Sequence, residues 1–462
     1  MADDRLTNAQ TRDLEALLHP YTNAVTHRQV GAHLIEGGSG VYVWDDQGRR
    51  FIEGLGGLWC CGLGFGDAEL IEAAREQLGK LPYYHLFGGR THEPAIELAE
   101  KIKDRFPVPM ARVFYCSSGS EANDTQVKLL WYRNNARGLP QKKKIISRRK
   151  GYHGVTLVAA SMTGLPMNHT QFDLPFDFVK HARTPHHWRE AEPGESETAF
   201  SARLAAELDA MIEAEGPDTV AGFISEPVMG AGGVIVPPAG YFEAIAPVLA
   251  KHDVAWIDDE VICGFGRTGA WFGAETFNMV PTSVSMAKQL TSGYVPLSAV
   301  AINAEIAETI EAETGRHPTF GHGYTYGGHP LGCAVGVKTL EIYEKRDIPG
   351  RVARLAPMFQ AKLQSFAEHP LVGEARGVGL MGALELSPDP ARAATFAQPG
   401  KVGPRLAQEL LNHGVILRAI GDSLAFCPPM IITEDEIEAL FEPIGTALDE
   451  TYAWARKEGH IA

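Results

Sequence analysis

The sequence predicts an α/β protein that has a large domain with a mostly parallel sheet and a smaller α+β domain. Between residues 60 and 330, short apolar runs alternate with helical patterns. Continuous apolar strands separated by helices are typical of a parallel sheet covered on both faces. After residue 350 the pattern changes to a second, smaller set of helices and strands, which indicates a separate unit.

The predicted strands of the large sheet follow one another along the chain. They cover residues 111–116, 145–147, 220–225, 255–259, 283–287 and 297–302. Helical stretches such as residues 243–253 lie between them. The strand at 297–302 follows its predecessor too closely for a helical crossover, so we expect one antiparallel pair.

The smaller domain is expected to draw on both ends of the chain. A hairpin at residues 41–53 turns at Asp45–Gly48, and a long helix at 330–346 connects the two domains. Further helices are predicted at 351–369, 401–414 and 434–457, and further strands at 378–386, 415–419 and 424–428. We therefore assign residues 1–60 and 331–462 to the small domain and residues 61–330 to the large one.

Composition and charge argue against a nucleic-acid or membrane partner. The chain of 462 residues has a formal charge of −15, and no basic stripe overrules that charge. The basic runs at 142–144 and 148–150 are interpreted as a solvated strand edge. No apolar run reaches the length of a bilayer span.

Cysteine usage and the first residues indicate a cytoplasmic protein. The six cysteines are scattered and form no CxxC pair, so no disulfide framework and no metal site are expected. The first ten residues, MADDRLTNAQ, are polar and acidic, which is unlike a signal peptide.

Polar side chains follow most of the predicted strands, at the point where each strand ends. In chain order they are Ser117–Ser120, Gly151–His153, Glu226, Asp258–Glu260 and Lys288. In an open parallel sheet, ligands bind at the carboxyl ends of the strands, so these groups should lie along one rim.

Taken singly, each of these groups has an ordinary structural interpretation. The stretch SSGSEAN at 117–123 is a good helix start with serine as the N-cap, Tyr152 and His153 could be packing residues, and Lys288 could be a surface lysine. His186 and His187 lack a third ligand and stay unassigned.

Taken together, the groups match the requirements of pyridoxal phosphate. A helix start with free N–H groups binds phosphate, an aromatic ring stacks on the pyridine, a carboxylate faces the ring nitrogen and a lysine forms a Schiff base. Such a role gives one of the three consecutive acids at 258–260 a reason to be buried.

The chain resembles the class III aminotransferases, which are fold-type I pyridoxal-phosphate enzymes, over nearly its whole length. The motifs that carry the resemblance are SSGSEAN (117–123), GYHG (151–154), SEP (225–227), DEVICGFGRTG (259–269), GYTYGGHP (323–330) and LRAIGD (417–422). The resemblance implies that Lys288 is the catalytic Schiff-base lysine. It also implies that the cofactor is bound by Ser118, Gly119, Ser120, Tyr152, Glu226, Asp259, Val261 and Thr325.

In the family, the threonine at the position of Thr325 reaches the phosphate of the neighbouring subunit. The resemblance therefore implies a homodimer with active sites at the interface, with a tetramer as the alternative. Substrate contacts are implied for Tyr21, Trp59, Phe87, Tyr152, Ala231, Ile262 and Arg418, with Arg418 binding a substrate carboxylate.

Ile262 stands where many members have glutamine, and Tyr21, Trp59 and Phe87 make the expected site aromatic. These residues favour the ω-amino-acid and amine:pyruvate transaminases over enzymes specific for ornithine or 4-aminobutyrate. We expect amino transfer from a primary amine or ω-amino acid to a keto acid, most simply pyruvate, by a ping-pong mechanism.

Three other functions fit part of the sequence. GFGRTG at 264–269 matches the GxGxxG pattern of NAD-dependent dehydrogenases, although the acids at 258–260 would face the pyrophosphate. An aminomutase or a dialkylglycine decarboxylase would share the fold and the cofactor. A non-catalytic binding protein would have no use for Lys288 together with Asp259.

Overall fold

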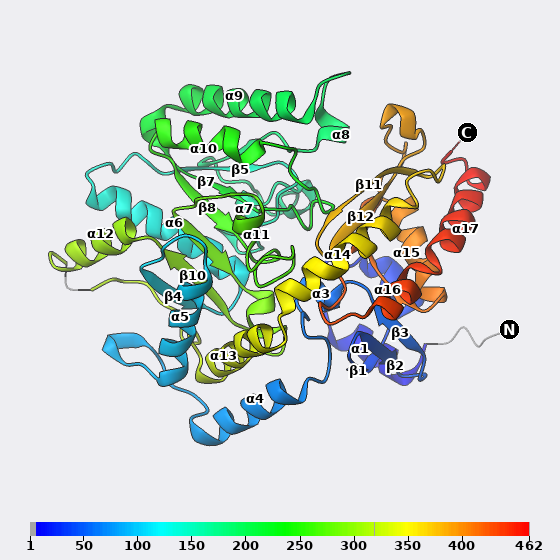
Figure 1. Cartoon of the computed structure of the whole chain (residues 1–462), viewed down its shortest axis with the longest axis horizontal. Coiled ribbons are helices and arrows are strands. Elements are labelled where there is room, and N and C mark those ends of the chain that lie inside the picture. Colours follow the sequence, from blue (N-terminus) through cyan, green and yellow to red (C-terminus); the bar gives the residue numbers. More distant parts are fainter. Residues whose placement is uncertain (1–5, 318, 462) are drawn as a thin grey trace.

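A computed structural model describes residues 6–317 and 319–461 of the chain. Figure 1 shows two bodies, a larger one in which helices surround a central sheet and a smaller one that contains both ends of the chain. The predicted fold class, an α/β large part with a smaller α+β part, is confirmed.

The large sheet has seven strands in the order β4-β10-β9-β8-β7-β5-β6. The strands are β4 (Arg112–Cys116), β5 (Lys144–Arg148), β6 (Val179–Ala182), β7 (Val220–Ser225), β8 (Ala255–Asp259), β9 (Ser283–Met286) and β10 (Ser298–Ile302). Strand β10 runs antiparallel to both of its neighbours, β9 and β4, and the other pairs are parallel. The expected antiparallel pair is present, and a second exists because β4 lies beyond β10.

Helices cover both faces of this sheet. They are α4 (Ala68–Lys80), α5 (Glu93–Arg105), α6 (Gly119–Ala136), α7 (Leu157–Met162), α8 (His187–Glu190), α9 (Glu197–Glu215), α10 (Tyr241–Lys251), α11 (Gly273–Thr276), α12 (Ala304–Thr314) and α13 (Pro330–Lys345). Short 3-10 turns lie at η1 (Phe87–Gly89), η2 (Pro166–Asn168), η3 (Pro217–Thr219) and η4 (Lys288–Thr291).

Alternation along the buried strands divides the interior into two layers. In β8, Trp256 packs into the cluster that includes residues of α5, α9 and α10, whereas Ile257 packs into the cluster that includes residues of α6, α7 and α12. Successive side chains of a strand point to opposite faces of the sheet. Asp258 therefore lies on the same face as Trp256, and Asp259 lies on the same face as Ile257. The two adjacent acids therefore lie on different faces of the sheet.

The smaller body contains two four-stranded sheets. One joins β1 (Ile35–Ser39), β2 (Tyr42–Asp45), β3 (Arg50–Glu53) and β13 (Val415–Ile416), and the other joins β11 (Val372–Val378), β12 (Met381–Leu386), β15 (Ser423–Phe426) and β14 (Arg418–Ile420). Strand β13 pairs with β3 in parallel, with Val415 opposite Ile52. This pairing connects the N-terminal segment to the C-terminal part, while the exact domain bounds stay a prediction.

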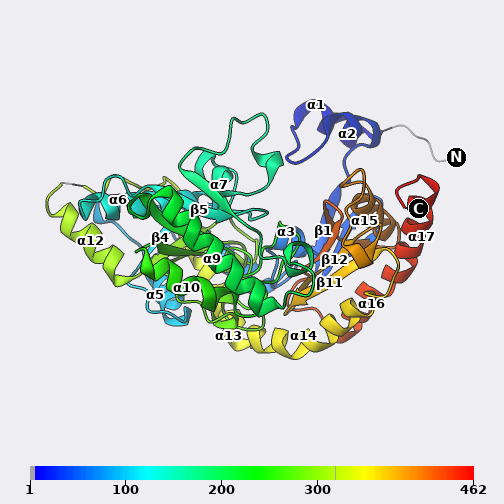
Figure 2. The same ribbon diagram turned by 90° about the horizontal axis from the view of Figure 1, so that it is seen from above.

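The remaining helices belong to the same body or lie on its edge. They are α1 (Asn8–Ala16), α2 (Ala24–Val30), α3 (Gly56–Trp59), α14 (Ile348–Gln364), α15 (Val402–Asn412), α16 (Glu434–Phe441) and α17 (Ile444–Lys457), with a 3-10 turn η5 (Pro390–Arg392). Seen from above, α1 and α2 lie on the side toward α7 of the large body (Figure 2).

Three predicted elements of the small domain differ from the structure. The strand expected at 378–386 begins only at Met381 as β12, since Gly379, with a positive φ of 58°, lies in the turn that follows β11. The strand expected at 415–419 is divided between β13 and β14, which belong to different sheets. The helix expected at 434–457 is broken before Pro443, which precedes α17.

The two basic runs are not a solvated edge, so that interpretation is wrong. Lys142 and Arg148 are 3% and 1% exposed. Their side chains find carbonyl acceptors far away in the sequence: Lys142 Nζ donates to His252 O at 3.1 Å, and Arg148 Nη2 donates to Glu226 O at 2.6 Å. Sequence position alone does not reveal such long-range partners.

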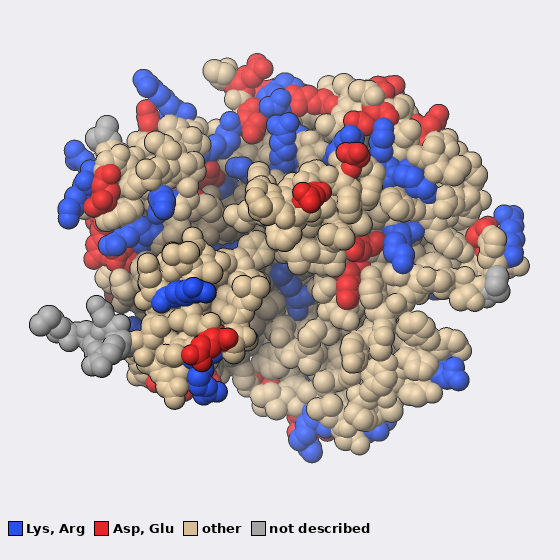
Figure 3. All heavy atoms as spheres, turned by 180° about the vertical axis from the view of Figure 1, so that it is seen from behind, with Lys and Arg blue, Asp and Glu red and all other residues tan. Residues whose placement is uncertain are grey.

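The surface carries both signs of charge. Figure 3 shows acidic and basic side chains interspersed on one face, which is hollowed near its centre. Within the described ranges, every helix is too short or too polar to cross a bilayer.

Candidate active site

A cavity of about 330 Å³ opens at the carboxyl ends of the parallel strands. It is lined by Ser118, Gly119, Ser120, Tyr152, Glu226, Asp259, Val261, Ile262 and Lys288 from the predicted set, together with Ser117, Asn123, His153, Gly154, Ala287, Thr291, Gly293, Val295, Pro296 and Leu297. The strand-end groups therefore lie around one space.

The start of α6 forms an anion-binding surface of the cavity. Ser118 is the N-cap, and its hydroxyl accepts the N–H of Glu121 at 3.2 Å. The first N–H groups of a helix have no acceptor within it, and for Gly119 and Ser120 no other described group supplies one. A Cβ on Gly119 would lie 3.2 Å from both methyl groups of Val261, so the absence of a side chain keeps this approach open. Free N–H groups and the helix dipole suit a phosphate.

Asp259 is a buried carboxylate held by three donors. Its Oδ2 accepts from Asn123 Nδ2 at 2.7 Å and from His153 Nδ1 at 2.8 Å, and its Oδ1 accepts the N–H of Val261 at 3.2 Å. It is 3% exposed. These donors fix the position of the carboxylate and compensate its charge. Within the described ranges, His153 is the one basic side chain that forms an ion pair with Asp259.

Asp258 and Glu260, the other two acids of the triplet, are buried away from the cavity. Both are fully buried on the opposite face from Asp259. Burial, then the neighbouring Glu260 and Asp259, raise the pKa of Asp258 well above its usual value. Burial also raises the pKa of Glu260 to about 7, and this carboxyl accepts the N–H of Ala274 at 2.7 Å. Asp259 is thus the only acid of the triplet that faces the cavity.

Lys288 follows β9 and begins the turn η4. Its backbone has a positive φ of 46°, which turns the chain sharply at the end of the strand. Burial lowers the pKa of Lys288, while the nearby Asp259, Cys60 and Glu226 oppose that shift. A lowered pKa favours the neutral amine, which is the nucleophilic form.

Glu226 takes a supporting position in the cavity wall. Its two oxygens accept the N–H of Tyr152 at 3.0 Å and the N–H of Gly230 at 2.9 Å. Burial raises the pKa of Glu226. The first of these bonds holds the backbone of Tyr152 and the second holds the loop at Gly230, so Glu226 is a positioning residue for the aromatic ring.

Tyr152 has two polar neighbours from distant segments. Burial raises its pKa, the nearby Tyr21 adds to that rise and the positive charge of Arg418 opposes it. The hydroxyl of Tyr21 accepts a hydrogen bond from Asn168 Nδ2 at 2.5 Å. Tyr21 and Arg418 therefore lie close to the ring of Tyr152, although neither lines the cavity itself.

The apolar side of the site is built around Trp59 and Ile262. Both belong to one buried cluster, and Trp59 is 2% exposed. A Cβ on Gly230 would lie 2.3 Å from Ile262 Cδ1, so glycine is needed where this side chain packs. Ala231 follows Gly230 and lies outside the cavity lining.

Thr325 and Phe87 lie elsewhere on the surface. Both are exposed, Phe87 to 49%, and neither lines the cavity of its own chain. The segment of Thr325 passes close to Phe87, because a Cβ on Gly323 would lie 2.7 Å from Phe87 Cζ.

The sequence reasoning missed His153 and Asn123 as partners of Asp259. His153 was interpreted as a packing residue, and the asparagine was seen only as part of the helix start. Asn123 occurs one turn into α6, where its side chain turns toward β8. One signal in the sequence could have found Asn123. The alternation of side chains along β8 places Asp259 on the face that α6 covers, so a partner from the start of α6 could be expected.

The two alternative motifs have structural roles. Residues 264–268 of GFGRTG are buried, and only the four-residue helix α11 follows, so the stretch offers no helix start for a dinucleotide. His186 Nε2 lies 2.8 Å from Glu374 Oε2, in a network that also contains Arg376.

Comparison with known proteins identifies relatives over almost the whole chain. The family model described as aminotransferase class-III matches residues 23–448. A tomato protein named γ-aminobutyrate transaminase 1, mitochondrial, is 45% identical over 436 residues, which cover 94% of this chain and 85% of that protein.

Solved structures agree. The ω-transaminase from Pseudomonas jessenii in complex with PMP has a TM-score of 0.96 at 49% identity and covers 97% of this chain and 99% of that one. A transaminase with L-alanine has a TM-score of 0.90 at 49% identity and covers 91% of this chain and 99% of that one.

The location expected from the sequence needs correction. The cytoplasmic location is wrong by this comparison, since relatives from tomato and rice are named mitochondrial or chloroplastic proteins. Cysteine spacing and a polar start do not distinguish these compartments. Relatives at 45–46% identity carry 4-aminobutyrate in their names, and a solved structure at 49% identity is an ω-transaminase, so the preference drawn from Ile262 stays a prediction.

The cavity fits the cofactor of this family. Helix N–H groups suit the phosphate, a buried carboxylate suits a cationic ring nitrogen, and a desolvated lysine suits an aldehyde. Class III aminotransferases use pyridoxal phosphate, and a solved relative contains its amino form. The chain belongs to the class III aminotransferases and is a pyridoxal-phosphate-dependent enzyme.

Proposed function

We propose that this aminotransferase moves the amino group of a primary amine or ω-amino acid to a keto acid, with pyruvate as the acceptor, by a ping-pong mechanism. The observation that carries the proposal is the contrast around Tyr152. The site combines the apolar cluster of Trp59 and Ile262 with the positive charge of Arg418, which acts on Tyr152 and forms no ion pair among the described residues.

Named relatives support both halves of the reaction. γ-Aminobutyrate, in the names of plant relatives, is an ω-amino acid. L-Alanine, present in a solved relative, is the amino acid that forms when pyruvate accepts an amino group.

Bound pyridoxal phosphate supplies an aldehyde carbon that takes the amino group and a ring that accepts electron density. Lys288 Nζ is placed to move the proton from the substrate carbon to its acceptor, because burial lowers its pKa and so favours the neutral amine that can take up a proton. Asp259, whose carboxylate is kept in place by Asn123 and His153, would stabilise a positive charge on the bound ring. Tyr152, whose backbone N–H is held by Glu226, would supply the aromatic surface for that ring.

A donor panel with pyruvate tests the proposal, with alanine formation as the readout. An apolar amine such as 1-phenylethylamine, an ω-amino acid such as 4-aminobutyrate and an α-amino acid without a terminal amine, such as leucine, should be compared. We expect alanine from the first two. Turnover that needs no keto acid would indicate an aminomutase or a decarboxylase and would overturn the proposal.

Arg418→Ala should impair only the keto-acid half of the reaction. Without the guanidinium, kcat/KM for pyruvate should fall by the worth of a charge-assisted contact, on the order of 2–4 kcal/mol. The half-reaction with an amine that has no carboxylate should change little. Single-turnover spectroscopy measures the halves separately.

Arg392→Ala provides the control for this experiment, since that arginine is 85% exposed and remote from the cavity. Equal losses in both half-reactions of Arg418→Ala would mean that Arg418 has a structural role only.

We propose a homodimer in which Thr325 and Phe87 complete the partner's site, with a tetramer of such dimers as the alternative. The exposed position of both residues, outside the cavity of their own chain, supports this arrangement. Cofactor occupancy should therefore fall when the protein is diluted below its dimer dissociation constant. Sedimentation with absorbance detection of the cofactor measures both quantities at once, and an active, fully loaded monomer would contradict the prediction.

A further inference from the structure

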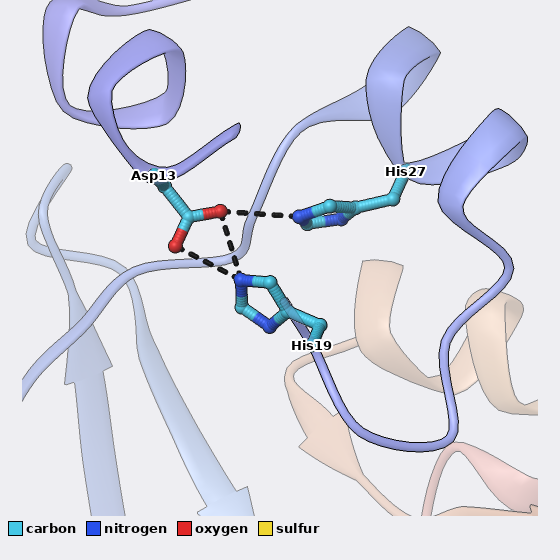
Figure 4. Close-up of side chains that lie close together, drawn as sticks. All are labelled: Asp13, His19 and His27. Atoms are coloured by element: carbon cyan, nitrogen blue, oxygen red, sulfur yellow. Dashed lines mark hydrogen bonds and ion pairs between the residues drawn. The ribbon is translucent and has the colours of Figure 1, made fainter. Parts of the chain in front are cut away.

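Helices α1 and α2 and the turn between them bring three metal-ligating side chains together (Figure 4). Asp13 lies in α1, His19 in the turn and His27 in α2. His19 Nε2 lies 2.9 Å from both carboxylate oxygens of Asp13, and His27 Nε2 lies 3.1 Å from Oδ2. Three segments thus direct two imidazole nitrogens and one carboxylate toward a common point.

Two other clusters of metal-ligating groups occur in the described part of the chain. They consist of His186, Glu374 and Glu385, and of Asp209, Glu213 and His252. Each already contains a fixed cation: Arg376 Nη1 lies 2.6 Å from Glu385 in the first, and Lys251 Nζ lies 2.8 Å from Asp209 in the second. A metal ion would be repelled from both.

The cluster of Asp13, His19 and His27 differs because it has no built-in cation. Within residues 6–317 and 319–461, the ion pairs of Asp13 are with the two histidines alone. Imidazole nitrogens and a carboxylate oxygen are both ligand types that divalent transition metals accept, and the three side chains bring them within reach of one another.

We propose that Asp13, His19 and His27 bind a divalent cation of the Zn²⁺ type. Two imidazole nitrogens and one carboxylate oxygen are a common ligand set for zinc, with bonds of about 2.0–2.2 Å. Tetrahedral ligands at that distance lie about 3.3 Å apart, so the present separations need to widen by only a few tenths of an ångström. Water can complete the coordination, because the side chain of His19 is 30% exposed.

The cation would fix the turn that carries Tyr21. This residue comes two positions after His19, has a positive φ of 51° and reaches Asn168 and Tyr152 in the large body. A bridge from α1 to the turn and α2 would hold the hydroxyl of Tyr21 at the active site. This consequence, unlike the cation site itself, rests on the proposed function and on the substrate contact that the family resemblance implies for Tyr21.

Calorimetric titration of the metal-stripped holoenzyme with Zn²⁺ tests the site directly. We expect one equivalent per subunit in the wild type and the loss of that equivalent in His27→Gln. His413→Gln is the matched control, because His413 also faces a carboxylate, Glu450 at 3.0 Å, but has no second histidine. Absence of binding, or binding that survives in His27→Gln, would overturn the proposal and leave a hydrogen-bonded cluster only.

X-ray absorption at the zinc edge separates this site from the vicinal thiols of Cys60 and Cys61, whose sulfurs lie 3.9 Å apart. We expect nitrogen and oxygen neighbours at about 2.0–2.1 Å, whereas a shell at about 2.3 Å would place zinc on sulfur and contradict the proposal.

Limited proteolysis and kinetics test the link to the turn. Zn²⁺ should slow cleavage within residues 8–30 and lower KM for the amine in the wild type, and should do neither in His27→Gln. Zinc bound without either effect would overturn the link to Tyr21. Calorimetry, absorption and proteolysis do not use turnover, so their results stand even if the proposed function fails.

Discussion

Lys288→Ala should lose transamination by a factor on the order of 10³ or more while the protein stays folded. The substitution removes both the nucleophilic amine and the group that carries the proton, and acid–base catalysis alone contributes about 10²–10⁴-fold. Stability should survive because burial already lowers the pKa of Lys288, so the folded protein gains little from its charge. Alanine formation from an amine and pyruvate measures the loss, and thermal melting of the apoenzyme measures the fold.

Lys143→Ala is the matched control for this variant. Lys143 is also a partly buried lysine whose pKa is lowered by burial, but it lies at the far end of β5 from the cavity. Its substitution should leave the rate unchanged. Normal transamination by Lys288→Ala would refute the assignment of the catalytic lysine.

Asp259→Asn should lower turnover on the order of 100-fold, the usual cost of removing one electrostatic stabiliser from a buried site. The amide has no charge with which to hold a protonated ring nitrogen. It also presents a donor to His153 and Asn123, which both donate to Asp259 in the native protein. Steady-state turnover under saturating cofactor gives the size of the effect.

Asp258→Asn separates the two adjacent acids. Burial and the neighbouring acids raise the pKa of Asp258 well above its usual value, which favours the neutral carboxyl, and an amide of the same shape is neutral as well. Activity should therefore stay close to that of the wild type. A crippling Asp258→Asn together with a harmless Asp259→Asn would show that the wrong acid has been assigned to the cofactor.

Residues at strand ends could be predicted from the sequence because topology alone brings them together. Lys288 and Asp259 each follow an apolar run, and parallel strands place their carboxyl ends on one edge. The partners of Asp259 could not be predicted in this way. His153 and Asn123 reach it from a loop and a helix, and their direction depends on how α6 packs over β8.

The small domain was harder to predict because its boundaries depend on pairing partners. Strand β11 carries a glutamate, an arginine and two glycines, so it shows no apolar run. Strands β13 and β14 are continuous in sequence, yet they join sheets whose other strands come from opposite ends of the chain. Local sequence patterns do not show which sheet each of these two strands joins.

The parallel pairing of β3 with β13 has a consequence for how the chain is synthesised. Ile52 N–H donates to Gly414 O at 2.9 Å, and Gly54 N–H donates to Ile416 O at 2.9 Å. A ribosome delivers the hairpin of β2 and β3 long before it delivers β13, so this edge waits unpaired through most of translation. An open strand edge is a template for pairing with another chain. The first hairpin made is thus among the last to be completed, and a nascent chain that ends before residue 415 carries an exposed edge that a chaperone must shield.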